Sequence, residues 1–328
     1  TAPYIEGDGY ALLGELPDPP LRMSDAFLER VTDRLAAAVR KAADSMQPFD
    51  QVGTSRAVVD RVASYRRMYR DGRLVSRVST AGKDPVMAAL PEGQIDPSIR
   101  TVTLARGGKP LARIHFYATH PQTFCCEGTV TSDFVGAARE KREKEEGVFQ
   151  LYFTGCSGDV TVGKYNDSSP EARKDLAGRL EKALRAASAG ARYAPVKDLA
   201  WRHVPLAVER KPAPPLAGRT GQDAYRMAIA AAFAARERPL DTASLTLGGV
   251  SMLFLPGEPV LEFQRYAQEA GRNRFVAVAG YGDIGPGYLV TDRQYEEGGY
   301  EPSASYAQPG TEARLKEAIR KLLGLEAR

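Results

Sequence analysis

The sequence predicts an α/β fold in which mixed β-sheets are layered with helices, and three observations support this. Segments with helical spacing of apolar residues alternate with short apolar runs typical of strands through most of the 328 residues. Two pairs of strand-like runs are joined by glycine-rich turns, which predicts antiparallel hairpins. Other strands are separated by helices, so parallel neighbours are expected as well.

The helices are predicted from their apolar spacing and from their ends. Ser24 is a good N-cap ahead of an amphipathic segment. Further along, Ser169, Pro170 and Glu171 supply an N-cap, a proline at the first helical position and an acidic first turn, and Gly190 ends that helix. The predicted helices are residues 27–46, 133–146, 170–189, 223–236, 260–270 and 312–323.

Strands are predicted where apolar runs are short and bounded by turn residues. Residues 101–104 and 111–117 flank an Arg-Gly-Gly-Lys turn, and residues 244–247 and 250–255 flank Gly248 and Gly249. Residues 1–20 are rich in glycine, proline and acidic residues and are predicted to form a loop, whereas residues 50–95 show no clear pattern. Further strands are predicted at residues 148–153, 201–208 and 275–279.

Length and composition indicate an ordinary globular protein with one large domain over residues 1–328. The 45 basic and 41 acidic residues give a net charge of +4 and are intermixed, which argues against nucleic-acid binding. No stretch has the roughly 18 apolar residues of a transmembrane segment. Three cysteines, of which Cys125 and Cys126 are adjacent, do not form a disulfide framework. No signal peptide is visible, and the compartment stays open.

Four loops that follow predicted strands carry residues whose side chains can bind a metal or take part in catalysis. These residues are His120, Thr161 at the end of a Gly-Cys-Ser-Gly-Asp-Val-Thr loop, Glu258 and Tyr288. Loops at strand ends often carry functional sites. Imidazole nitrogen and carboxylate oxygen suit a borderline cation such as Zn²⁺. His115 is an odd number of residues from His120, so the two lie on opposite faces of an extended strand.

Each of these residues also has a purely structural explanation. A lone histidine is often a hydrogen-bonded core residue, and Tyr288 fits a core or rim aromatic equally well. Glu258 lies just before a predicted helix, where the helix dipole stabilises an acid. Asp133 is similarly placed at a helix start and could be an N-cap. The spacing alone leaves both interpretations open.

The order of the motifs resembles that of the neutral ceramidase family. The segments IHFYATHPQTF and TSDFVG look like the family's stretch in which a strand delivers a zinc-binding histidine. Further on, GCSGDVT is similar to a loop built on Gly-Asp-Val-Ser, LPGEPV resembles the Pro-Gly-Glu motif, and GPGYLVTDRQY resembles the segment with a zinc-binding tyrosine. The resemblance spans nearly the whole chain and implies a zinc-dependent catalytic domain that hydrolyses an N-acyl amide or a similar lipid-like substrate.

The resemblance assigns roles to particular residues. It implies that His120, Glu258 and Tyr288 are Zn²⁺ ligands, that Arg66 helps to bind substrate, and that Thr161 stands where the family has a serine near zinc. Two acidic residues would support the metal ligands without binding the metal themselves: Asp133, within TSDFVG, and Asp159, within GCSGDVT.

Two departures from the family qualify these roles. The opening TAPY resembles the residues that follow the family's first His-x-His motif, so the resemblance implies a further histidine ligand upstream of Thr1. Thr161 adds a methyl group where the family has serine. An immunoglobulin-like C-terminal domain is also not recognisable. The family resemblance would place the protein outside the cytoplasm, either secreted or periplasmic.

Three functions follow from the sequence. In the first, zinc activates a water molecule for attack on an amide carbonyl, and Arg66 stabilises the developing charge. In the second, the chain keeps the fold without a working site and is a non-catalytic binding module. In the third, Thr1 is an N-terminal nucleophile, although the proline and glycines that follow it do not fit a buried strand.

Overall fold

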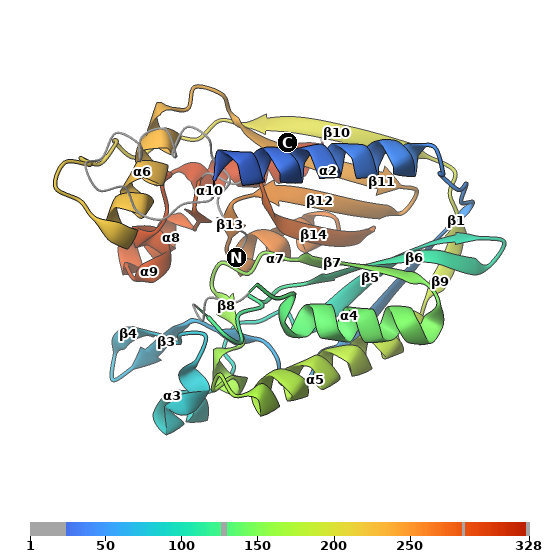
Figure 1. Cartoon of the computed structure of the whole chain (residues 1–328), viewed down its shortest axis with the longest axis horizontal. Coiled ribbons are helices and arrows are strands. Elements are labelled where there is room, and N and C mark those ends of the chain that lie inside the picture. Colours follow the sequence, from blue (N-terminus) through green and yellow to red (C-terminus); the bar gives the residue numbers. More distant parts are fainter. Residues whose placement is uncertain (1–23, 126–129, 284–285, 326–328) are drawn as a thin grey trace.

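The computed structural model describes residues 24–125, 130–283 and 286–325, and it contains two main β-sheets packed face to face (Figure 1). The first sheet has the order β7 (Phe149–Thr154), β6 (Lys109–Tyr117), β5 (Ser98–Arg106), β1 (Gln51–Val58) and β9 (Arg192–Pro195). The second has the order β10 (Leu199–Leu206), β11 (Leu240–Leu247), β12 (Val250–Pro256) and β14 (Phe275–Gly282). Only β6–β7 and β12–β14 are parallel among these neighbours, so the mixed sheets expected from the sequence are confirmed.

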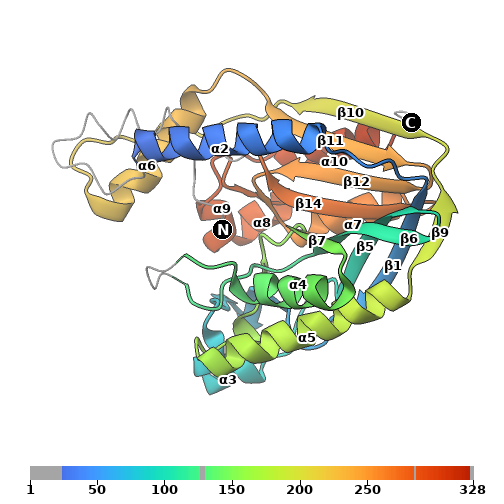
Figure 2. The same ribbon diagram turned by 45° about the vertical axis from the view of Figure 1, so that its right-hand side comes forward.

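Helices cover the outer face of each sheet, which gives four layers in all (Figure 2). α4 (Asp133–Glu146) and α5 (Pro170–Ala189) pack on the five-stranded sheet, while α7 (Leu261–Ala270) and α10 (Thr311–Leu322) pack on the four-stranded sheet. Between the sheets, apolar side chains such as Phe116 and Met252 form a separate core. Both faces of each sheet are therefore buried over much of their area, as layered α/β packing requires.

The predicted helices all form, and their caps explain where they begin and end. Ser24 accepts a hydrogen bond from Phe27 N–H at the start of α2 (Asp25–Ala43), and Ser169 accepts one from Ala172 N–H at the start of α5. The helix predicted at 223–236 is α6 (Gly221–Ala235). α2 is the least buried of them: Leu35 is 62% exposed on its surface.

The two predicted hairpins are also present. Gly107 and Gly108 connect β5 to β6 with φ angles of 54° and 78°. A two-residue turn with both φ angles positive matches the right-handed twist of antiparallel strands, and glycine adopts it without a Cβ clash. The glycines are therefore what allows β6 to return alongside β5 and to deliver the segment that follows it.

Residues 50–95 contain more structure than their pattern indicates. β1 lies inside the five-stranded sheet, paired with β5 on one side and β9 on the other. Its buried positions include Gly53 and Ser55, so the hydrophobic alternation that identifies a strand is weak. The same region also holds β2 (Ser64–Tyr65), β3 (Arg67–Arg70), β4 (Arg73–Ser76), a 3₁₀ turn η1 (Ala81–Lys83) and α3 (Pro85–Ala89).

Some predictions fall on residues outside the described ranges. These are the loop at residues 1–20, the Thr1 nucleophile and Cys126. Within the described ranges, no helix combines the length and the apolar character needed to cross a membrane.

Each sheet contributes one parallel strand pair joined by a helix. α4 connects β6 to β7, and α7 follows β12 and precedes β14. Because the carboxyl ends of parallel neighbours lie at the same sheet edge, the segments that follow these four strands are brought together. The remaining short elements are β8 (Val160–Thr161), η2 (Gly163–Tyr165), β13 (Glu258–Pro259), β15 (Tyr288–Leu289), α8 (Asp292–Glu297) and α9 (Tyr300–Ser303).

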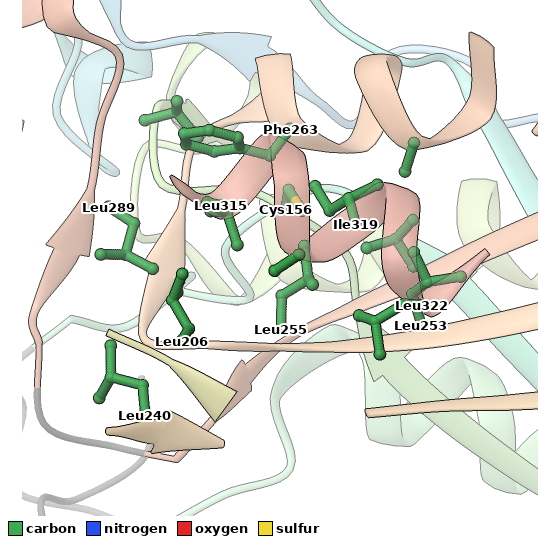
Figure 3. Close-up of a cluster of buried hydrophobic side chains, with 14 of the residues drawn as sticks. Cys156, Leu206, Leu240, Leu253, Leu255, Phe263, Leu289, Leu315, Ile319 and Leu322 are labelled. Atoms are coloured by element: carbon green, nitrogen blue, oxygen red, sulfur yellow. The ribbon is translucent and has the colours of Figure 1, made fainter. Parts of the chain in front are cut away.

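The loop after β7 is anchored in the core by its cysteine. Cys156 is fully buried among Leu255, Phe263 and Ile319, as Figure 3 shows. Its backbone N–H also donates to the side chain of Gln264 at 3.1 Å. Burial raises the pKa of the thiol well above its usual range, so Cys156 acts as a small apolar anchor that fixes the residues after it.

Candidate metal centre

His120 follows β6 and is held in one orientation by the backbone. Its side chain is 1% exposed, and Nδ1 lies 2.9 Å from the carbonyl oxygen of Val160. A carbonyl can only accept a hydrogen bond, so the proton of a neutral imidazole is on Nδ1. The lone pair of Nε2 is then free to bind a cation, which is the usual arrangement of a metal-binding histidine.

The Nε2 atom of His120 faces a carboxylate. Glu258 Oε2 lies 2.8 Å from it, and the hydroxyl of Tyr281 lies 3.2 Å from it. Burial would raise the pKa of Glu258, but a second proton on the imidazole, through its hydrogen bond and its charge, outweighs burial and lowers that pKa. Two lone pairs that face each other at this distance need a shared positive centre: either a second proton on the imidazole or a bound cation.

Tyr288 is placed beside Glu258 by a short parallel ladder. Glu258 in β13 pairs with Tyr288 in β15, so the two side chains leave adjacent backbones. The rings of Tyr288 and His120 are 6.5 Å apart at an interplanar angle of 26°. Burial and then the charge of Glu258 raise the pKa of the Tyr288 hydroxyl, which without a cation remains protonated.

Arg66 places a positive charge beside Tyr288. It lies between β2 and β3, and its Nη1 donates to the Tyr288 hydroxyl at 3.1 Å and to the Gly158 carbonyl at 3.3 Å. The guanidinium also packs on the ring of Tyr300 at 4.9 Å and lies 3.5 Å from Glu301. These contacts fix a cation next to the tyrosine hydroxyl.

Thr161 lies on the backbone beside His120. The two residues form a parallel bridge, and Thr161 also pairs with Ser64 in the β2–β8 ladder. The Thr161 side chain is buried, and its hydroxyl accepts the Gly163 N–H at 3.3 Å. Among the described residues, no hydrogen bond joins this hydroxyl to the imidazole or to the carboxylate of Glu258.

The two predicted supporting acids hold the backbone on either side of the centre. Asp159 is buried and accepts hydrogen bonds from Leu261 N–H at 2.9 Å and from Gln294 at 3.0 Å, which fixes the start of α7 just after Glu258. Burial raises its pKa. Asp133 accepts hydrogen bonds from the backbone and hydroxyl of Thr123. It therefore ties down the chain soon after His120 without touching the ring.

The donor set fits a borderline cation. The carboxylate of Glu258 and the phenol oxygen of Tyr281 meet at Nε2 of His120, and Tyr288 pairs with Glu258 in the adjoining ladder. Zinc accepts nitrogen and oxygen ligands of these kinds. The described residues contain no group of three or more His, Cys, Asp or Glu side chains suited to a metal. A cation at this site would therefore need the tyrosines, or donors from elsewhere, to complete its coordination shell.

The architecture was compared with known proteins. No protein-family profile matches the sequence, and no curated protein is similar to it in sequence. Among solved structures, the neutral ceramidase from Pseudomonas aeruginosa superposes with a TM-score of 0.63 at 14% identity, over 90% of this chain and 56% of that chain. This chain has a ceramidase-like fold. A ceramidase complexed with C2 gives a TM-score of 0.61 at 14% identity, over 86% of this chain and 55% of the other.

The chain thus spans a little over half the length of the ceramidase structures it matches. On this ceramidase-like fold, the structure brings His120, Glu258, Tyr288 and Arg66 together. It places Thr161 next to them on the backbone, with Asp159 and Asp133 behind them. The roles of these residues in metal binding and catalysis stay predictions.

Sequence reasoning missed two residues of the candidate metal centre. Tyr281 contacts His120, and Ser157 lies 2.6 Å from the Tyr281 hydroxyl. Tyr281 has a φ of 66°, which turns its side chain in an unusual direction at the end of β14. The sequence offered one signal, since Tyr281 opens the same YGDIGPGY segment that contains Tyr288, but the backbone conformation was not readable from it.

A cavity adjoins the centre next to Tyr281. It has a volume of about 310 Å³ and is lined mainly by apolar groups, including Pro121, Phe153, Phe254 and Gly280. This volume is at the lower end of the range for small-molecule sites. Its walls come from the ends of β7, β12 and β14, the strands that also carry the candidate metal centre.

Proposed function

We propose that this chain is the hydrolytic α/β region of a zinc-dependent hydrolase that cleaves N-acyl amides. The observation that carries the proposal is the imidazole of His120, whose Nδ1 is fixed by a carbonyl and whose Nε2 faces the Glu258 carboxylate at 2.8 Å. A buried arrangement of this kind is favourable when a cation lies between the two groups. The ceramidase-like fold supports this reaction class among the many that α/β folds perform.

His120, Glu258 and Tyr288 would hold the metal, with Tyr281 beside them. When bound, zinc supplies Lewis-acid polarisation of the amide carbonyl and lowers the pKa of a water molecule towards neutrality. The raised pKa of the Tyr288 hydroxyl and the lowered pKa of Glu258 describe the site without that charge. A nearby divalent cation would favour the ionised form of both oxygens.

Arg66 would stabilise negative charge on the substrate oxygen. Its guanidinium is held in place by contacts with Tyr288, Tyr300 and Glu301, so little reorganisation is needed during the reaction. Fixed donors aimed at developing charge are worth more than mobile ones. The side chain is 13% exposed, which is compatible with contact to a bound ligand.

The hydroxyl groups near His120 would hold and pass protons. Ser157 and Tyr281 form a hydrogen-bonded pair next to the imidazole of His120. The leaving amine of an amide must gain a proton, and a chain of hydroxyl groups can deliver one. We retain Thr161 as a catalytic residue that orients water or substrate, since its backbone lies directly beside His120.

The apolar cavity next to Tyr281 would take the acyl chain of the substrate. Phe153 and Phe254 pack edge to face at 5.8 Å and form part of its wall. Burial of methylene groups there favours long acyl chains over short ones, by about 0.8 kcal/mol for each buried group. Ceramide belongs to this substrate class, along with other lipid-like N-acyl amides.

The test is hydrolysis of a fluorogenic long-chain N-acyl amide by the protein at its natural length. We expect chelation to abolish hydrolysis, added Zn²⁺ to restore it, and the His120→Gln variant to stay inactive after zinc addition. Hydrolysis that persists in metal-free protein would contradict the proposal. A protein that holds no zinc and hydrolyses no amide would instead fit a non-catalytic binding module.

A further inference from the structure

A second cavity lies at the opposite end of the two-sheet core and is surrounded by arginines. Its volume is about 450 Å³, and its lining includes five arginines and one carboxylate. Phe275, which contacts two of these arginines, begins β14, and Tyr281 of the candidate metal centre lies near the end of the same strand. At ~3.3 Å per residue the two sites are about 20 Å apart. The charged lining groups are Arg56, Arg100, Arg265, Arg272, Arg274 and Glu269.

Two of the arginines are forced together by strand pairing. Arg56 in β1 is directly opposite Arg100 in β5 in the antiparallel register. Their guanidinium carbons lie 5.4 Å and 5.8 Å from the centre of the Phe275 ring. Like charges at directly opposed positions destabilise a sheet. Packing of both guanidinium groups on the Phe275 ring offsets part of this cost, but it does not neutralise either charge.

Arg100 is buried without adequate partners. Its side chain belongs to a residue that is 7% exposed, and its Nε and Nη1 atoms have no hydrogen-bond partner. Burial, and then the charge of Arg56, lowers the pKa of Arg100 to about 10. A buried polar group that lacks a partner is unfavourable. Arg100 lines the cavity, so an anion bound there would compensate its buried charge.

Nearby acidic groups do not balance the cluster. The charge of Asp96 offsets part of that of Arg100, but the hydrogen bonds of its carboxylate go to Gln264, Gln268 and the backbone of Ser98 and not to the guanidinium. Glu269 pairs with Arg272 at 3.2 Å. Within the described ranges, neither Arg56 nor Arg100 is in an ion pair.

The guanidinium groups of the other two arginines donate hydrogen bonds to backbone carbonyls. Arg265 donates to Ile95 and Arg274 donates to Leu323. Each guanidinium has five N–H donors, so both retain donors for a ligand. The cavity thus combines several positive groups from two strands and one helix end with a single paired carboxylate.

We propose that this cavity is a binding site for an anion that carries a phosphoryl group. Guanidinium groups pair bidentately with phosphate oxygens, and several arginines arranged around one space suit a tetrahedral dianion better than a planar carboxylate with one charge. The site is concave, whereas a surface that binds a nucleic-acid backbone is typically an extended basic stripe. The volume leaves room for a phosphorylated small molecule as well as for phosphate itself.

The experiment is titration of the protein with inorganic phosphate by calorimetry at constant ionic strength, with acetate as the comparison anion. We expect saturable binding of phosphate near one per chain and no saturable binding of acetate. Arg56→Gln and Arg100→Gln should each weaken phosphate binding at least tenfold. Arg106→Gln is the matched control, because Arg106 is an exposed arginine on the same strand as Arg100. It should bind phosphate as the wild type does.

Thermal unfolding separates a ligand site from a structural cluster. In phosphate-free buffer, Arg56→Gln and Arg100→Gln should melt no lower than the wild type, because each removes charge repulsion. Phosphate should raise the melting temperature of the wild type and of Arg106→Gln but not that of the two cavity variants. If phosphate does not bind saturably, or binds Arg56→Gln and wild type equally, the proposal is wrong.

Vesicles identify the source of the phosphoryl group. One set contains phosphatidic acid in phosphatidylcholine, and the other contains phosphatidylcholine alone. Capture by the first set that is lost in Arg100→Gln would assign a lipid headgroup. Binding of phosphate in solution without vesicle capture would assign a soluble phosphorylated ligand. The absence of both kinds of binding overturns the site.

Discussion

Nε2 of His120 and Oε2 of Glu258 lie 2.8 Å apart although 138 residues separate them in the sequence. His120 follows a strand of one sheet and Glu258 follows a strand of the other, so the contact depends on how the two sheets pack. Each residue is delivered by the carboxyl end of a parallel strand pair. The candidate centre is therefore a product of the whole four-layer arrangement.

Removal of either proposed ligand should weaken zinc binding. His120→Gln and Glu258→Gln each delete one donor while keeping side-chain size, and we expect zinc affinity to fall by at least about 100-fold, the upper end of what loss of a mere supporting contact costs. Competition with a zinc-sensitive dye measures this. His203→Gln is the control, because His203 is an exposed histidine that hydrogen-bonds Asp241. Equal affinity in His120→Gln and His203→Gln would show that the imidazole at position 120 does not bind zinc.

Loss of the guanidinium at position 66 should slow the chemical step. Arg66→Gln removes the fixed cation beside Tyr288, and we expect kcat for amide hydrolysis to fall by about 100-fold. Zinc content should stay unchanged, because Arg66 is not a ligand. Arg70→Gln, on the neighbouring strand β3, changes an exposed arginine and should leave kcat near the wild-type value. A similar decrease in both variants would point to a general effect of charge.

A side chain at Gly158 should disturb the candidate metal centre, because it would collide with the backbone of Glu258. A Cβ atom at this position would lie 2.7 Å from the carbonyl oxygen of Glu258. Gly158→Ala should displace β13 and lower zinc affinity. Gly178→Ala is the control, since nothing lies within 4 Å of a Cβ atom there and alanine should stabilise α5 by up to about 1 kcal/mol. Unaltered zinc affinity in Gly158→Ala would show that the loop and the ligand strand are not coupled.

His115 should make the protein less stable in mild acid. Its ring is buried between Thr101 and Gln150, and burial lowers its pKa to about 4. The unfolded chain takes up a proton near pH 6.5, where the folded chain does not. The stability that neutral His115 contributes is therefore complete above pH 6.5 and is lost as the pH falls towards 4, by roughly 3 kcal/mol.

Urea unfolding between pH 7.5 and pH 4.5 measures this dependence. His115→Gln lacks the titrating group, so its unfolding free energy should fall less steeply over that interval than that of the wild type. His203→Gln is the matched control, because it removes an exposed histidine in place of the buried one. Identical slopes for His115→Gln and the wild type would contradict the assignment.

The sequence predicted the helices well because their ends are marked by local chemistry. Ser169 and Gly190 act within a few residues of their own position, and the structure confirms both as caps. β1 was not predicted because its burial depends on strands far away in the sequence. Gly53 is buried under the ring of Tyr193 in β9, a contact that no local pattern reveals.

In the candidate site, too, features marked by local sequence were predicted and features that depend on distant contacts were not. His120, Glu258 and Tyr288 were found because each stands at a predicted strand exit in a recognisable motif. Tyr281 and Ser157 were missed because their importance arises from a positive φ angle and a side-chain contact. Thr161 was placed near the centre, but the direction of its hydroxyl depends on the turn at Gly163. Local sequence therefore indicated which segments meet and not which atoms face one another.

Anomalous diffraction at the zinc edge, from crystals of the natural-length protein grown with Zn²⁺, tests the central claim most directly. We predict one strong peak within coordination distance, about 2.0–2.2 Å, of both His120 Nε2 and a carboxylate oxygen of Glu258. A protein that binds zinc only elsewhere, or that shows His120 and Glu258 in direct contact with no metal between them in zinc-saturated crystals, would contradict the account.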